Sequence, residues 1–96
     1  MNHEEYLRIK DEANRRAREI VPRWLPGRQE RNEWIAKNPT RDDKNAGSFK
    51  INLKTGKWKD WANDDKGGCI VSLAMYLHGD RTPYEAAANL AKLMGL

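Results

Sequence analysis

The fold is decided by the stretch "SFKINLKTGKWKDW", Ser48–Trp61. Its first half alternates the apolar residues Phe49, Ile51 and Leu53 with polar residues, which is typical of a strand that buries one face. The sequence "KTGK" that follows places a glycine in a short polar segment, as in many turns between paired strands. The stretch therefore predicts a β-hairpin.

The chain before the hairpin is predicted to begin with one amphipathic helix. Apolar residues recur at steps of three and four over Glu4–Val21. Pro22 is expected to end this helix, because proline has no amide donor. The sequence "PRWLPGR" is then expected to form a kinked connector, and a short strand-like run, Glu33–Lys37, leads into a long polar loop.

Two helices are predicted after the hairpin. The run "CIVSLAMYLHG" has an apolar stripe and ends at Gly79, so it predicts a buried helix. Thr82 and Glu85 have the spacing of a capping box in front of a second helix, Pro83–Met94. Together these elements predict one α+β domain, residues 1–96, in which a small antiparallel sheet packs against an N-terminal helix and two C-terminal helices.

Composition limits the possible environments and partners. The chain has 18 Lys and Arg against 14 Asp and Glu, and its net charge of +4 suits a polyanionic partner without establishing one. The only cysteine, Cys69, excludes an internal disulfide and a cysteine-built zinc site. The sequence has no apolar signal segment and no membrane-spanning run, so we expect a cytoplasmic protein without a membrane partner.

The centre of the chain combines lysines with tryptophans. No acidic residue occurs between Lys44 and Lys59, whereas charges of both signs are mixed elsewhere. Lysines neutralise phosphates, and aromatic rings offer flat surfaces on which unpaired bases stack. Trp58 and Trp61 are the candidates for stacking. The lysines of this stretch are Lys44, Lys50, Lys54, Lys57 and Lys59.

Structural interpretations compete with this hypothesis. Residues three apart on a strand point to opposite faces, so at least one of Trp58 and Trp61 is expected to be buried. The lysines are equally well explained as a solvated edge that prevents strand pairing. Asp60, Asp64 and Asp65 are possible ligands of a hard metal ion in a metal-dependent enzyme, but acidic residues before a helix are also explained by capping.

No motif in the sequence supports catalysis by this chain alone. There is no glycine-rich phosphate loop, no Ser/His/Asp arrangement and no carboxylate pair in an apolar setting. His3 and His78 are far apart and have no ligand-spaced partners, while Cys69 opens a buried helix. We therefore expect a chain that is not an enzyme.

The segment "NPTRDDKNAGSFKINLKTGKWKDWANDDKGGCIVSLAMYLHG" resembles the CHC2-type zinc-ribbon domain of DNA primases, in the divergent form found at the N-terminus of phage and mobile-element primase-helicases. Gly47–Phe49 stands where the family has Pro-Ser-Phe, and Gly67–Cys69 stands where the family has Gly-Gly-Asp. The trailing "EAAANLAKLMG" helix is also similar to the family. The chain differs from the family at the positions of the metal ligands.

The resemblance implies a version of the domain without zinc. Asp60 and Asn63 occupy the positions of the family's Cys-x-x-Cys pair, and the region around Trp34 and Asn38 has neither cysteine nor histidine. Tryptophan packing and polar pairing would then replace the stabilisation that the ion supplies, and no cofactor is expected. The candidates for this replacement core are Trp34, Trp58 and Trp61.

The function that the resemblance implies is binding of single-stranded template DNA during primer initiation. The chain would be a non-catalytic module of a DNA replication primase or primase-helicase, with a primase polymerase domain or a replicative helicase as partner. The alternative is a protein-interaction module that docks onto a replication polymerase or helicase through an apolar helix surface and the arginines of the first helix. The candidate nucleic-acid-binding residues are Arg41, Lys50, Lys54, Lys57, Trp58, Lys59 and Trp61.

Overall fold

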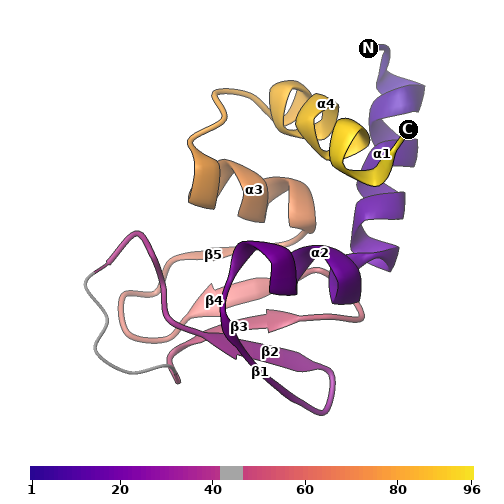
Figure 1. Ribbon diagram of the computed structural model, residues 1–96. Coiled ribbons are helices and arrows are strands. Elements are labelled where there is room, and N and C mark those ends of the chain that lie inside the picture. The colour runs from indigo at the N-terminus through magenta and orange to yellow at the C-terminus, as the bar shows by residue number, and fades with distance from the viewer. Residues whose placement is uncertain (42–46) are drawn as a thin grey trace.

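The computed structural model describes residues 1–41 and 47–96, and it shows the expected α+β architecture (Figure 1). Lys44 and the middle of the expected polar loop lie outside the described residues. The elements in chain order are α1 (His3–Arg15), α2 (Ala17–Trp24), β1 (Gly27–Glu30), β2 (Glu33–Ala36), β3 (Phe49–Asn52), β4 (Trp58–Asp60), β5 (Lys66–Gly67), α3 (Ile70–His78) and α4 (Pro83–Met94).

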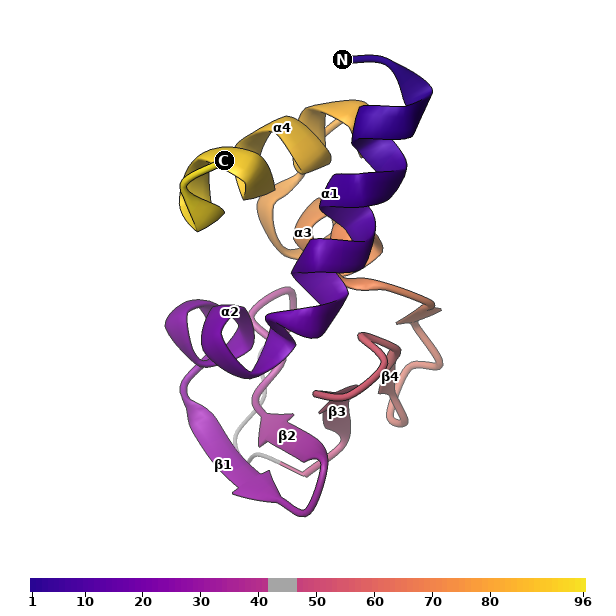
Figure 2. The same ribbon diagram turned by 90° about the vertical axis from the view of Figure 1, so that its right-hand side faces the viewer.

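The five strands form one antiparallel sheet in the order β1-β2-β3-β4-β5. Figures 1 and 2 show the helices on one side of this sheet, with α2 directly above the strands and α1 leading away from them. Trp34, Ile51 and Trp58 are aligned across β2, β3 and β4 and face the helices, because Ile51 and Trp58 are buried in the core cluster and Trp34 packs against it. We call the opposite side the outer face of the sheet.

The predicted hairpin is confirmed. Phe49, Ile51 and Leu53 are all buried, as their alternation with polar residues indicated. The turn includes Gly56, whose φ of 82° lies in the left-handed region that favours glycine. The strand-like run over Glu33–Lys37 is also confirmed as β2.

The expected single N-terminal helix is wrong in its details. The chain breaks at Arg16, which caps the C-terminus of α1, and α2 then continues to Trp24 with Pro22 inside it. Pro22 cannot donate a hydrogen bond to the carbonyl four residues earlier, and its ring crowds that carbonyl. Burial of Ile20 and Val21 in the core offsets that loss.

The expected connector "PRWLPGR" is wrong at both ends, because its first three residues belong to α2 and a strand that pairs with β2 begins at Gly27. All four residues of β1 are exposed, so the strand has no apolar alternation by which it can be recognised. Leu25, just before it, is buried, and the ring of Trp24 packs edge-on against His78, with 4.8 Å between the ring centroids.

The two C-terminal helices are confirmed. α3 ends at Gly79 in the left-handed conformation, and Oγ1 of Thr82 accepts a hydrogen bond from the backbone amide of Glu85 at 3.1 Å. The second half of the capping box differs from the expectation, since the Glu85 carboxylate accepts from the amide of Arg81. The apolar faces of α3 and α4 supply Leu73 and Leu90 to the core.

Candidate nucleic-acid interface

Cations are aligned across the outer face of the sheet. The strand register places Arg28, Ile35, Lys50, Lys59 and Lys66 opposite one another, one from each of the five strands. Residues opposite one another in an antiparallel sheet share a face, and neighbouring strands are about 4.8 Å apart. We call these residues the cation row. Ile35 is only 4% exposed, so the row has four cations around one buried apolar residue. One of these cations, Arg28, also lies 3.6 Å from Glu30.

Two members of the cation row were missed by sequence reasoning. Arg28 lies on β1, where no alternation marks a strand, and Lys66 lies on β5, which is only two residues long. The lysine-rich stretch between Lys44 and Lys59 suggested the hairpin alone as the basic surface. Antiparallel pairing of β5 with β4 is what places Lys66 beside Lys59.

Lys59 makes two contacts at the end of β4. Its Nζ lies 3.0 Å from Oδ1 of Asp64 and 3.9 Å from the ring centroid of Trp61. The hydrogen bond from Lys59 and the charges of Lys59 and Lys66 lower the pKa of Asp64 below its usual range. Asp64 has a left-handed backbone, φ 65°, a conformation that aspartate tolerates better than most residues. The Asp64 carboxylate thus positions the ammonium group of Lys59, and a bound phosphate would compete with this carboxylate for Lys59.

Trp61 is exposed and Trp58 is not. The indole of Trp61 is 65% exposed beside the cation row, whereas Trp58 is 6% exposed and its Nε1 donates to Oγ of Ser72 at 2.9 Å. The ring of Trp58 also lies 4.6 Å from that of Tyr76, centroid to centroid. The expectation that one of the pair is buried is confirmed. Trp58 as a base-stacking residue is wrong for this structure, because the core covers its ring.

The expected packing role is confirmed for two of the three tryptophans and is wrong for the third. Trp34 packs against the core and its Nε1 donates to the carbonyl of Leu25 at 2.9 Å. Trp58 is a member of the core cluster. Trp61 points the other way because it follows Asp60, whose side chain is on the inner side of the sheet.

Lys54 and Lys57 lie at the turn of the hairpin. Both are exposed, and the backbone carbonyl of Lys57 accepts from the amide of Asn52, which continues the pairing of β3 and β4. The side chain of Asn52 accepts from the amides of Lys54 and Thr55 and closes the turn. The structure therefore brings Lys50 and Lys59 together in the middle of the hairpin and leaves Lys54 and Lys57 at its end.

Arg41 belongs to a different group of side chains. Its Nε donates to Oδ2 of Asp60 at 2.9 Å, and its Nη2 donates to Oγ of Ser48 at 3.0 Å. Asp60 is fully buried, and the side chain of Arg41 is 30% exposed. The arginine proposed to assist DNA binding thus neutralises a buried carboxylate in this structure.

Asp60 is the centre of a buried polar network. Its carboxylate accepts from Nδ2 of Asn38 at 2.8 Å, from Arg41 and from the amide of Ala62 at 2.9 Å. Burial raises the pKa of Asp60, but hydrogen bonds from Asn38, Ala62, Arg41 and Ser48 outweigh it and the pKa is lowered overall. Asp60 is therefore charged at neutral pH.

The network connects the loop after β2 with the end of β4 and with α3. Nδ2 of Asn38 also donates to the hydroxyl of Tyr76 at 2.7 Å, and that hydroxyl donates to Oδ2 of Asp65 at 2.7 Å. Oδ1 of Asn38 accepts from the amide and the hydroxyl of Thr40. We call Asn38, Thr40, Arg41, Asp60, Asp65 and Tyr76 the polar network.

The expected capping role of the acidic residues is wrong. Cys69 caps the N-terminus of α3, and no acidic residue lies in the first turn of that helix. Asp64 instead pairs with Lys59, and Asp65 accepts from Tyr76. Among residues 1–41 and 47–96, no group of three or more His, Cys, Asp and Glu side chains is arranged to hold a metal ion.

Comparisons with known proteins do not identify a family for this chain. No protein-family model matches it, and no curated protein sequence matches it either. No helix within the described ranges has both the length and the apolar character needed to cross a membrane.

Proposed function

We propose that the chain is a non-catalytic module of a DNA replication primase or primase-helicase that binds single-stranded template DNA for primer initiation. The observation that carries this proposal is the cation row beside the exposed ring of Trp61. In this proposal, catalysis belongs to a polymerase domain that acts with this module.

The chemistry of the outer face suits a single strand. Lys50, Lys59 and Lys66 lie on adjacent strands, so their Cα atoms span about 10 Å, and they offer several cations to one phosphate backbone. Stacking of a base on an aromatic ring contributes about 1–3 kcal/mol, and Trp61 is exposed beside this row, next to Lys59. A base in a duplex has both faces stacked already, so Trp61 favours a single strand.

The polar network supports the primase context. Asp60 stands at the position of the first cysteine of the family's Cys-x-x-Cys pair, and Asn38 comes from the region that would hold the first ligand pair. Their direct hydrogen bond of 2.8 Å joins the two segments that a zinc ion would otherwise join. Polar pairing in place of the ion is what the resemblance led us to expect.

Titration of labelled single-stranded oligonucleotides with Lys50→Glu/Lys59→Glu tests the proposal by fluorescence anisotropy. We expect a large loss of affinity at low salt. The slope of log K against log salt should also become shallower by about 1.4, because each phosphate contact on a single strand contributes about 0.7. The matched control is Arg81→Glu/Lys92→Glu, which changes the net charge equally at exposed positions beside and on α4.

Two results would contradict the proposal. One is the absence of oligonucleotide binding by the native chain at low salt. The other is an equal loss of affinity in the hairpin variant and in the helix control, because binding would then depend on net charge and not on the outer face.

The alternative function is docking onto a replication polymerase or helicase. It is favoured by a groove of about 470 Å³ between α1 and α4, which includes Arg8 and Arg15. Co-purification of the chain with such a partner, without DNA affinity of the isolated chain, would select this alternative. DNA binding that depends on Lys50 and Lys59 would select the first.

A further inference from the structure

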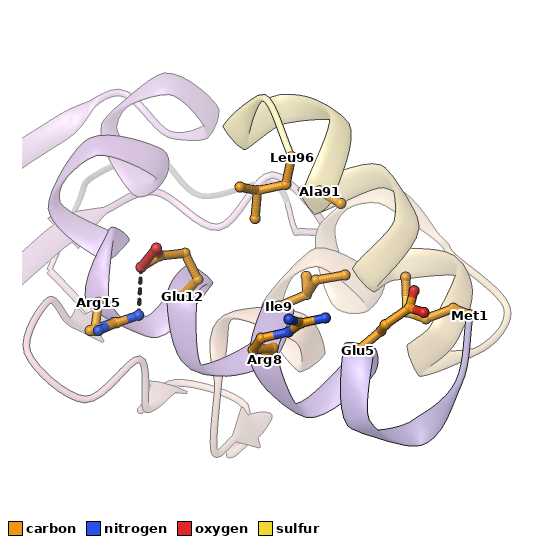
Figure 3. Close-up of a pocket in the computed structure, with 8 residues that line it drawn as sticks. All are labelled: Met1, Glu5, Arg8, Ile9, Glu12, Arg15, Ala91 and Leu96. Carbon is orange, nitrogen blue, oxygen red and sulfur yellow. Dashed lines mark ion pairs between the residues drawn. The ribbon is translucent and has the colours of Figure 1, made fainter.

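The groove between α1 and α4 has an apolar floor and a charged wall. Ile9 and Ala91 form its floor, and Met1 and Leu96, which are 51% and 64% exposed, lie at its edges (Figure 3). The wall is one face of α1. The residues that line the groove are Met1, Glu5, Arg8, Ile9, Glu12, Arg15, Ala91 and Leu96.

The charged wall follows a regular pattern along α1. Glu5, Arg8, Glu12 and Arg15 are spaced by three, four and three residues, so they lie on one stripe of the helix. Their signs alternate from the N-terminal end to the C-terminal end. Within the chain, Glu12 pairs with Arg15 at 3.0 Å (Figure 3). Glu12 also lies 3.6 Å from Arg16. Arg15 remains 74% exposed and is available to a partner.

The alternating charges of one α1 helix are complementary to those of a second, antiparallel copy of α1. When two copies of α1 are placed side by side in antiparallel orientation about Lys10, Glu5 faces Arg15 of the second copy, and Arg8 faces Glu12 of the second copy. By symmetry these contacts repeat, so four opposite-charge pairs form. A two-fold symmetric parallel arrangement instead places each charge opposite its own copy. Charge patterns on helices select partner and orientation in this way.

We propose that the α1 stripe joins two copies of this chain as an antiparallel homodimer. The exposed side chains of Met1 and Leu96 would be covered at the edges of the contact. The stripe carries two positive and two negative charges, so it offers a phosphate backbone no net attraction. α1 leads away from the sheet, so two copies joined here keep both outer faces accessible (Figure 1).

Sedimentation of the native 96-residue chain over a range of concentrations tests this proposal. We expect a dimer that forms weakly, because contacts of about one helix per partner are small, and that dissociates at high salt. Glu5→Lys/Glu12→Lys has an all-positive stripe and Arg8→Glu/Arg15→Glu has an all-negative stripe. Each variant alone should be monomeric, and an equimolar mixture should recover a dimer.

The mixture separates the proposal from a general loss of stability, because a misfolded variant cannot regain a partner. Circular dichroism of each variant confirms that it is folded. A native chain that is monomeric at every concentration would overturn the proposal. So would a dimer that both variants retain, a mixture that stays monomeric, or a stripe that binds only a polymerase domain. Loss of the dimer without loss of oligonucleotide binding would support it and leave the DNA-binding function unaffected.

Discussion

Replacing the buried carboxylate of Asp60 by an amide, Asp60→Asn, tests whether the polar network stabilises the fold. The change keeps the size of the side chain, so it creates no cavity. It removes the negative charge that faces the guanidinium of Arg41, and it places an amide NH2 group among donors from Asn38, Arg41 and Ala62. At least one donor then loses its acceptor.

The loss of stability that we expect from Asp60→Asn depends on how deeply the ion pair of Asp60 and Arg41 is buried. Breaking a buried ion pair costs about 3–5 kcal/mol, and the lower end applies because the side chain of Arg41 is still 30% exposed. We expect the free energy of unfolding to fall by about 3 kcal/mol, a large share of the 5–15 kcal/mol or so of a typical domain. At an m-value of about 1–1.5 kcal/mol/M, the urea midpoint falls by about 2–3 M.

The pH dependence gives a second, independent readout. The pKa of Asp60 is lowered from its usual 3.8 in the folded chain, so its stabilising contribution is complete above that value. The contribution is lost as the pH falls through 3.8 toward the folded pKa. The stability difference between the native chain and Asp60→Asn should therefore be constant near neutral pH and shrink in acid.

The assay is urea denaturation followed by tryptophan fluorescence, with Asp64→Asn as the matched control. Asp64 pairs with Lys59 at an exposed site, and asparagine tolerates its left-handed backbone. We expect the control to keep the native midpoint at neutral pH. If Asp60→Asn has the same midpoint as the native chain, the network does not stabilise the fold and the reasoning is refuted.

Two further predictions concern the glycine pair before α3 and the exposed tryptophan. Gly67→Ala should destabilise the fold by about 1–3 kcal/mol in the same assay, because the added Cβ would overlap the indole of Trp58, whereas Gly68→Ala meets open space and should be nearly neutral. Equal effects of the two substitutions would contradict this packing. Trp61→Ala should weaken single-stranded oligonucleotide binding by about 5–150-fold, from about 1–3 kcal/mol of stacking, and keep the native denaturation midpoint.

Predictions from sequence succeeded where periodicity and local chemistry agreed. The alternation in β3, the left-handed glycine after α3 and the Thr82 cap of α4 are local signals, and the structure shows all three. Pro22 misled because its local cost lies in the preceding turn, where one hydrogen bond is lost and a carbonyl is crowded. Burial of Ile20 and Val21 on the inner face of α2 offsets that cost, and it depends on tertiary packing. β1 has four exposed residues and β5 has two residues in all, so neither has a detectable period.

The candidate site was predictable only in part for a related reason. Lys50 and Lys59 are recognisable because the hairpin that pairs them is local in sequence. Arg28 joins the cation row through β2 and Lys66 through β4, so both depend on the order of strands in the sheet. Which tryptophan is exposed depends on which residues of β4 face inward. The hydrogen bond from Trp58 to Ser72 on α3 holds Trp58 on the inner face.

The polar network and the proposed DNA-binding face meet in the three consecutive residues Lys59, Asp60 and Trp61. Lys59 and Trp61 face outward, whereas Asp60 between them faces inward and is held by Asn38 and Arg41. Because side chains alternate along a strand, fixing Asp60 on the inner side also fixes the direction of its two neighbours. A metal ion bound at this position would impose the same constraint. We infer that hydrogen bonds to one buried carboxylate orient the cation and the ring that we propose to contact DNA.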